Sequence, residues 1–484
     1  MHKLKCNITR KYTKTSAAKA SAAKTIQRFV RKRNTRQRML REESRIFTNT
    51  AQGKRLARLM KHRDTIKSDL DYLNAVCSDA GVCIAFGKEI DKIKSFFDGF
   101  VNFNYLKSHV KRMGKVSSNG FVKLLQYERA GYSANAILKS SAKPDADNLF
   151  YEYLVGMYIN KQCVRFPCFV ETYGIFRYIS ETAYSRMKDK ATHEVSSVKS
   201  GLVPMKQGQF DEACRGPQFC SVLVQHIKNA PSLADKCHDA EFVKHDLLYV
   251  LFQLYMPLAQ LKDEFTHYDL HLDNVLVYEP VKDNYIEYHY HIGDNKIVSF
   301  KSFYIAKIID YGRSFFDDRE NSGVTGSSSR IYKKVCSESD CVPSCGYNSG
   351  FAWLAPNSNN PLDNYYISSQ VKNRSHDLRL LMMLRRKSNT PAFQLAVKNV
   401  TTKNPVLHTL LKKVKYEMKY GTPEMKHNGY KPRILNVEDA KNALLDLVLR
   451  ASSISDNAMA YSGKKKLGDM YVYSDGRPLQ YMSA

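Results

Sequence analysis

The sequence predicts a mixed α+β fold in which strands come first, helices follow, and a basic helical extension precedes both. Three observations support this class. Strand-like apolar segments recur from Gly120 to Gln225, a long apolar run covers Leu247 to Phe265, and positive charge gathers before residue 64. The segment Glu241 to Phe265 is expected to form one long helix of a larger, helical lobe. With 484 residues, of which 43% are hydrophobic, the chain is long enough for two or three domains and a sizeable core.

The cysteine content indicates a reducing compartment. The chain has 11 Cys in scattered positions, an odd number, and no apolar signal segment follows Met1. We therefore expect an intracellular protein without a disulfide framework. The longest apolar run, Leu247 to Leu261, is interrupted by Pro257 and is too short to span a bilayer, so no transmembrane segment is expected.

Residues 1–63 form a basic arm, in which 20 Lys and Arg residues stand against two Glu residues. Such an excess of positive charge seeks an anionic partner, whether nucleic acid, an acidic protein or an anionic membrane face. Residues 3–25 offer little to bury, so this part of the arm is expected to be disordered.

A helical pattern with an apolar stripe begins within the arm. Its residues Ile26, Arg31 and Arg36 resemble the calmodulin-binding IQ pattern, although Lys32 replaces the Gly of that pattern. A calmodulin-like protein is therefore a second candidate partner, because such proteins accept basic amphipathic helices. The plainer alternative is a basic helix that lies on an anionic surface.

A helical lead-in over residues 64–114 is expected to precede a β-meander. The meander has a strand from Gly120 to Tyr127 and a second strand from Asn135 that ends in Lys139. A helix follows from Leu149 to Asn160, and Glu152 is the only acid inside it.

Two polar loops further along the chain carry the strongest chemical signal. Asp269 and Asn274 lie five residues apart between the long apolar run and a β-branched strand, and a second apolar strand then leads to Asp310. Phosphoryl transfer needs hard oxygen ligands for a divalent metal, a carboxylate near the attacking hydroxyl, and phosphates held in line. The sequence therefore predicts a magnesium-dependent phosphoryl transfer site.

The motifs Thr-His-Tyr-Asp-Leu-His-Leu-Asp-Asn, from residue 266, and Asp-Tyr-Gly, from residue 310, resemble the catalytic loop and the metal motif of the protein kinase superfamily. The resemblance implies a bilobal protein kinase-like fold that uses ATP and Mg²⁺. It makes Asp269 the catalytic base, and Asn274 and Asp310 the metal ligands. It also implies that His267 supports the loop and that Asp377, at the start of a later helix, bonds the loop backbone.

The same resemblance implies a nucleotide site in the small lobe. Lys139 is expected to contact the α- and β-phosphates, with Glu152 as its helix partner. Gly120 would be the last glycine of a phosphate loop that is otherwise poor in glycine. His226 and Lys228 belong to the expected hinge, where backbone groups read adenine.

The catalytic loop departs from the kinase pattern at two positions. Tyr268 replaces the arginine that reads a phosphorylated activation loop, and His271, the second predicted catalytic residue, replaces a lysine. The histidine also makes the loop similar to small-molecule kinases of the aminoglycoside phosphotransferase type. A small-molecule acceptor therefore stays an alternative to a protein substrate.

Two further clusters admit a metal interpretation. His289 and His291 lie two apart on one strand of an enlarged hairpin expected between Asn274 and Asp310, but no neighbouring cluster completes four zinc ligands. Cysteines 336, 341 and 345 form a second cluster without the paired spacing of a zinc site.

These features divide the chain into the basic arm, the lead-in, a small lobe over 115–228, a large lobe over 229–450 and a C-terminal tail over 451–484. The Tyr- and Lys-rich style of the motifs is similar to the divergent protein kinases of nucleocytoplasmic large DNA viruses. That similarity implies a host cytoplasm or a virion as the setting. The leading hypothesis is a Ser/Thr protein kinase; the alternatives are a pseudokinase or basic virion scaffold, and a small-molecule kinase.

Overall fold

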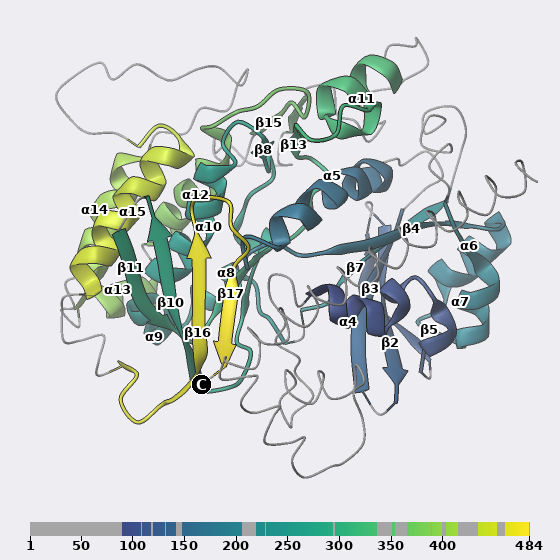
Figure 1. Cartoon of the computed structure of the whole chain (residues 1–484), viewed down its shortest axis with the longest axis horizontal. Coiled ribbons are helices and arrows are strands. Elements are labelled where there is room, and N and C mark those ends of the chain that lie inside the picture. Colours follow the sequence, from purple (N-terminus) through teal and green to yellow (C-terminus); the bar gives the residue numbers. More distant parts are fainter. Residues whose placement is uncertain are drawn as a thin grey trace, which may run out of the picture. The chain divides into compact units, whose positions relative to one another are not determined.

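In the computed structural model of the chain, the described residues are 90–107, 109–117, 120–130, 132–141, 148–205, 219–227, 229–293, 296–335, 351–353, 365–388, 390–398, 403–414, 434–452 and 460–483. All of them belong to one compact unit, which runs from Cys77 to Ala484. The basic arm with its IQ-like segment, the cysteine cluster and Lys228 lie outside the described residues. The described part has a mixed α+β structure, as the sequence predicts (Figure 1). The bilobal arrangement stays a prediction.

A seven-stranded antiparallel sheet forms the first part of the fold. Its strands stand in the order β5-β1-β2-β3-β7-β4-β6. The bounds are β1 Val110–Ser117, β2 Gly120–Arg129, β3 Tyr132–Ser141, β4 Thr172–Tyr178, β5 Thr192–His193, β6 Leu202–Pro204 and β7 Cys220–Gln225. Lys139 of β3 lies opposite Val122 of β2 and opposite Val222 of β7. It is therefore held in the middle of the sheet.

The two edge strands of this sheet come from one short stretch of chain. β5 pairs with β1, β6 pairs with β4, and α7 (Val195–Gly201) joins β5 to β6. In a flat sheet, six strand spacings would separate these edges by about 29 Å. A helix of this length spans only about 10 Å. The sheet must therefore curl until its edges approach each other, and the segment 181–204, which we call the strap, closes it.

The strap is held by cationic side chains of β1 and β2. Arg112 donates to the carbonyls of Lys188 and Lys190 at the end of α6 (Glu181–Asp189). Lys123, which is fully buried, donates to the carbonyl of Lys190 at 2.5 Å. Cations are favourable at a helix C-terminus, where carbonyls lack partners. These contacts tie the β1–β2 hairpin to the strap.

The first strand begins inside the range predicted for the lead-in. The described part of that range contains α4 (Ile90–Phe96), η2 (Asp98–Phe100) and η3 (Phe103–Tyr105), and the first strand begins at Val110 instead of after residue 114. The reason is the strap, because Val110 pairs with His193. That partner is distant in the sequence, and the local pattern around Val110 does not reveal it.

Helix α5 (Asn148–Cys163) packs against the sheet and carries Glu152. Gly156 marks the closest approach, because an added Cβ there would lie 2.1 Å from Oγ1 of Thr172 on β4. Any larger residue would push α5 away from the sheet. The absence of a side chain at residue 156 therefore helps to set the position of Glu152 relative to β3.

The predicted long helix over 241–265 is wrong in its bounds, since two helices replace it. They are α9 (Ala240–His245) and α10 (Leu247–Gln260), whose residues from Leu247 to Ala259 are all buried. The break falls at Asp246, whose buried carboxylate accepts hydrogen bonds from Ser302 Oγ and Tyr461 Oη. A buried carboxylate must find donors, and these donors belong to distant segments.

Further helices contribute buried side chains to the same core as α10. They are α8 (Leu233–Lys236), α11 (Ser328–Val335), α12 (Arg379–Lys387), α13 (Pro391–Lys398), α14 (Lys403–Lys413) and α15 (Val437–Ser452). The described chain also forms the short turns η6 (Val324–Gly326) and η7 (His376–Leu378) and the small ladder of β14 (Phe351–Trp353) and β15 (Tyr365–Ile367). α15 packs along α10. In the part of the chain that is described, no helix is both long and apolar enough to cross a bilayer.

A four-stranded sheet packs against α10 and α15 through β10 (Asn284–Ile292) and β11 (Lys296–Ser302). These two strands confirm the predicted hairpin. The segment 451–484, expected as a separate tail, instead adds β16 (Lys465–Tyr473) parallel to β10 and then β17 (Gln480–Ser483). Figure 1 shows the yellow C-terminal strands beside this hairpin. The apolar side chains of β16, Met470 and Val472, are fully buried, which accounts for the correction.

Candidate active site

Two short ladders hold the polar loops beside each other. β8 (Phe265–Thr266) pairs with β13 (Phe315–Phe316), and β9 (Val275–Tyr278) pairs with β12 (Ile305–Ile308). The loop with Asp269 and Asn274 runs from β8 to β9, and the loop with Asp310 runs from β12 to β13. Because both ends of each loop are paired with the other loop's ends, the two loops lie together.

Lys139, Glu152 and Asp310 meet although they come from β3, α5 and the second loop. The Lys139 ammonium donates to both Glu152 oxygens at 2.6 and 2.8 Å and to Asp310 Oδ1 at 3.2 Å. The Glu152 side chain is 5% exposed, whereas that of Asp310 is 48% exposed. The lysine therefore has one buried partner and one partner that faces solvent.

The charges of this triad are mutually dependent. The Lys139 ammonium holds the pKa of Asp310 below its ordinary value. Burial by itself would lower the pKa of Lys139, but the two carboxylates outweigh it and raise that pKa. Burial raises the pKa of Glu152, while the ammonium opposes the rise. At neutral pH, Asp310 is ionised and Lys139 is charged, which suits contacts with a metal and with phosphate oxygens.

Asp377 holds the backbone of the loop that carries Asp269 and Asn274, as predicted. Its carboxylate accepts hydrogen bonds from the backbone N–H groups of His267 at 2.8 Å and Tyr268 at 3.1 Å. Tyr268 has a φ of +62°, and Asp310 has a φ of +68°. Residues other than glycine rarely adopt this region, which costs about 1–3 kcal/mol. The surrounding hydrogen bonds therefore hold both loops in strained conformations.

His267 links the two loops. The imidazole is fully buried, its Nε2 donates to the carbonyl of Ile309 at 3.0 Å, and its Nδ1 accepts from the Asp269 N–H at 3.3 Å. Burial lowers the pKa of His267, so the ring is neutral and these two bonds set its tautomer. The expected supporting role of His267 agrees with this geometry.

Asp269 lies at the centre of the first loop. Its carbonyl accepts a hydrogen bond from Asn274 Nδ2 at 2.9 Å, so the amide oxygen of Asn274 is left as the side-chain atom available to a metal. Nε2 of His271 is 3.8 Å from Asp269 Oδ1, and its Nδ1 accepts from the Asp273 N–H at 3.2 Å. Burial lowers the pKa of His271, so it is a neutral neighbour of the carboxylate.

A cavity of about 370 Å³ opens above the triad. Its lining joins apolar side chains to the charged triad: Met113, Val122, Ile137, Lys139, Glu152, Val170, Thr172, Val224, Gln225, His226, Ile227, Ala230, Leu276, Ile309, Asp310 and Tyr311. The size and the mixture of apolar walls with a few charged groups are typical of small-molecule sites. His226 thus lies at the cavity, whereas Gly120, with a φ of +140°, begins β2 and is not among the lining residues.

Asp310 and Asn274 offer a donor set that fits Mg²⁺. Both supply hard oxygen atoms, and both belong to loops that the paired strands bring together. The Asp310 carboxylate is ionised and half-exposed, so its second oxygen is accessible to a cation.

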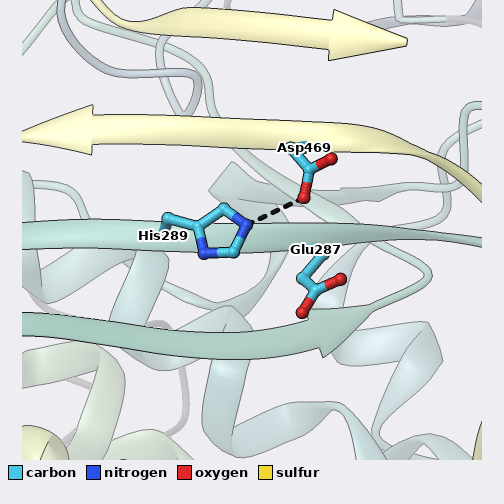
Figure 2. A group of neighbouring side chains, drawn as sticks. All are labelled: Glu287, His289 and Asp469. Carbon is cyan, nitrogen blue, oxygen red and sulfur yellow. Dashed lines mark hydrogen bonds and ion pairs between the residues drawn. The ribbon is translucent and has the colours of Figure 1, made fainter. Parts of the chain in front are cut away.

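The histidines of the large hairpin do not form the zinc site considered above. His289 instead bonds Asp469 Oδ1 at 2.8 Å, with Glu287 nearby (Figure 2). The Lys466 ammonium lies 2.7 Å from both Glu287 and Asp469. A positive charge therefore already occupies the position between the carboxylates, and the group is an ion-pair network. His291 lies apart from it, with its ring against Tyr473.

Sequence reasoning missed Arg379, whose Nη1 donates to Asp269 Oδ1 at 2.9 Å. The two residues are 110 positions apart. The only indication in the sequence was an arginine two residues after Asp377, at the start of a predicted helix. An arginine at such a position does not by itself indicate a contact with a catalytic carboxylate.

No family model matches the chain, and no curated protein matches it. Solved structures do match, 597 chains in all. Among them is "WaaP in complex with acyl carrier protein", which is 11% identical to this chain, covers 48% of it and 73% of its own length, and superposes with a TM-score of 0.23. A similarity at this level defines neither the fold nor the activity of the chain.

Proposed function

We propose that the protein is an ATP- and Mg²⁺-dependent protein kinase that phosphorylates Ser and Thr hydroxyls. The observation that supports this most strongly is the convergence of Lys139, Glu152 and Asp310 at one cavity. Asp310 lies 171 positions from Lys139 in the sequence, and each of the three residues has the chemistry that one part of a phosphoryl transfer site requires.

In this proposal the apolar walls of the cavity hold the adenine ring, and Val122, Ile137 and Leu276 are among them. The backbone of His226 and Ile227 offers hydrogen-bonding groups at the edge of the ring. The Lys139 ammonium then lies where it can contact phosphate oxygens, and Glu152 holds it there.

Asp310 and Asn274 are the residues that would hold magnesium. The ion would shield the phosphate charge and orient the transferred group. Asp269 accepts the proton of the acceptor hydroxyl, while the buried bonds of His267 and Asp377 keep its loop in place. His271 lies beside Asp269 as a neutral side chain that lines the acceptor side of the loop.

The protein acceptor and the viral setting rest on the resemblance of the loop motifs to divergent kinases of large DNA viruses. The basic arm is proposed to recruit an anionic partner, either nucleic acid or, through the IQ-like segment, a calmodulin-like protein. Both proposals are independent of the nucleotide site, because no proposed catalytic residue lies in residues 1–63.

Substitution Asp310→Asn tests the nucleotide and metal part of the proposal. An amide offers one neutral oxygen where the metal needs a charged one, so thermal stabilisation by ATP in magnesium should vanish. Asp446→Asn on the exposed side of α15 is the matched control and should keep the full shift. An unchanged shift in Asp310→Asn would remove Asp310 from the metal role. Nucleotide binding without any transfer would favour the pseudokinase alternative.

A further inference from the structure

The Arg379 guanidinium lies against the carboxylate that we assign to the acceptor hydroxyl. Its Nη1 is 2.9 Å from Asp269 Oδ1, and the two side chains are 9% and 16% exposed. The nearest atom of His271 also approaches Oδ1, at 3.8 Å. Among the residues that the structure describes, no donor contacts Oδ2 of Asp269. The polar neighbours of this carboxylate therefore gather on one oxygen and leave the other for a substrate.

Arg379 is itself well anchored. It is the first residue of α12 and follows η7, which contains Asp377. The carbonyl of Asp377 accepts a hydrogen bond from Tyr255 Oη of α10 at 2.8 Å. One turn of chain thus fixes the backbone of the catalytic loop through Asp377 and the side chain of Asp269 through Arg379.

We propose that Arg379 is a positioning residue for phosphoryl transfer, an inference that rests on the proposed function. By holding Oδ1, it turns Oδ2 of Asp269 toward the acceptor hydroxyl. In the transfer step the acceptor oxygen bonds to the γ-phosphorus, and its proton moves to Oδ2. The bond from that phosphorus to the bridging oxygen breaks, and ADP leaves with the electron pair.

The physical reason is the freedom of an aspartate side chain. Rotation about its terminal bond moves both oxygens, whereas a charge-assisted bond from a buried guanidinium selects one orientation. Misplacement of a reacting group by about 1 Å can cost about a hundredfold in rate. The rate of transfer should therefore depend on Arg379, although Arg379 lies outside the nucleotide cavity.

Substitution of Arg379 would also lower activity if this residue only stabilised the fold. The test therefore needs measurements that a purely structural role would not change. Steady-state kinetics with ATP and a Ser/Thr peptide would be measured for Arg379→Met, Arg379→Lys and Arg379→Ala. Arg385→Met, an exposed arginine on the same helix, is the matched control. Each variant is first checked for folding and for Mg-ATP-dependent thermal stabilisation.

We expect Arg379→Met to lower kcat about a hundredfold with an unchanged KM for ATP, and Arg379→Lys to retain part of the activity. Guanidinium ion at millimolar concentration should restore part of the activity of Arg379→Ala. In an Asp269→Asn background, Arg379→Met should cause no further loss, because the two residues act as one unit.

An active wild type together with full activity in Arg379→Met overturns this inference and leaves the proposed function intact. Additive losses in the double variant, or an equal loss in Arg385→Met, overturn it as well. Should Arg379→Met fail to fold, Arg379→Lys and the guanidinium rescue of Arg379→Ala decide the question. A folded wild type that binds Mg-ATP but transfers no phosphate overturns the proposed function, and the inference falls with it.

Discussion

Substitution Glu152→Gln separates a buried charge pair at the nucleotide cavity from an ordinary surface ion pair. Glu152 is 4% exposed and accepts two bonds from the Lys139 ammonium, at 2.6 and 2.8 Å. Glutamine keeps one neutral acceptor and places an N–H₂ group beside the ammonium. A hydrogen bond to a charged group contributes about 1.5–3 kcal/mol, so the loss of one such bond should lower the free energy of unfolding by about 2 kcal/mol.

The same substitution should weaken nucleotide binding. In the variant, the remaining anionic partner of the Lys139 ammonium is Asp310, at 3.2 Å on the solvent side. We expect roughly a tenfold loss of Mg-ATP affinity, which corresponds to about 1.4 kcal/mol. Urea unfolding with and without Mg-ATP measures both effects in one series.

The pair Lys262–Glu438 supplies the control, because its ions are 2.7 Å apart but 27% and 44% exposed. Surface pairs of this kind contribute about 0–1 kcal/mol. Glu438→Gln should therefore change stability little and leave ATP affinity unchanged. The reasoning is refuted if Glu152→Gln is as stable as Glu438→Gln and binds Mg-ATP as tightly as the wild type.

Three further predictions concern parts of the chain around the cavity. Burial raises the pKa of Asp377 to about 7 from its ordinary value of 3.8, so the folded state binds a proton more tightly than the unfolded state. The contribution of Asp377 to the free energy of unfolding should therefore fall as the pH rises between these two pKa values. Asp377→Asn should abolish this pH dependence of stability in urea unfolding. Arg112→Gln combined with Lys123→Met should release the strap and speed amide hydrogen exchange in β1 and β2, since each lost bond contributes about 1 kcal/mol; unchanged exchange would contradict the strap's role. Deletion of residues 1–63 should leave Mg-ATP binding intact while it removes salt-sensitive binding to DNA, and retained DNA binding would assign that affinity to another surface.

The residues that could be predicted are those for which metal binding and proton transfer require a particular residue type at a fixed position in a loop. Asp269 and Asn274 lie on one short loop, and Asp310 follows an apolar strand, so their meeting could be expected from the order of motifs alone. The partnership of Lys139 with Glu152 was implied by the resemblance to protein kinases, because Glu152 is the only acid in the helix that was expected to follow the Lys139 strand.

The rest depended on partners that no local pattern contains. The break at Asp246 follows from donors on Ser302 and Tyr461. The sequence of β16 predicts only a short tail, because its pairing with β10 is not visible in the local pattern. β1 begins earlier than predicted because it pairs with β5 of the strap. Arg379 is the clearest case, since a buried arginine gains its meaning only from the carboxylate that it contacts.

The most direct test of the central claim is transfer of labelled γ-phosphate from ATP to Ser/Thr peptides in magnesium, comparing the wild type with Asp269→Asn. We expect the wild type to phosphorylate a hydroxyl, and Asp269→Asn to bind Mg-ATP with nearly unchanged affinity while turnover falls by roughly a hundredfold to ten-thousandfold. No transfer by a folded, nucleotide-binding wild type would contradict the account. Equal turnover in Asp269→Asn would place the base elsewhere.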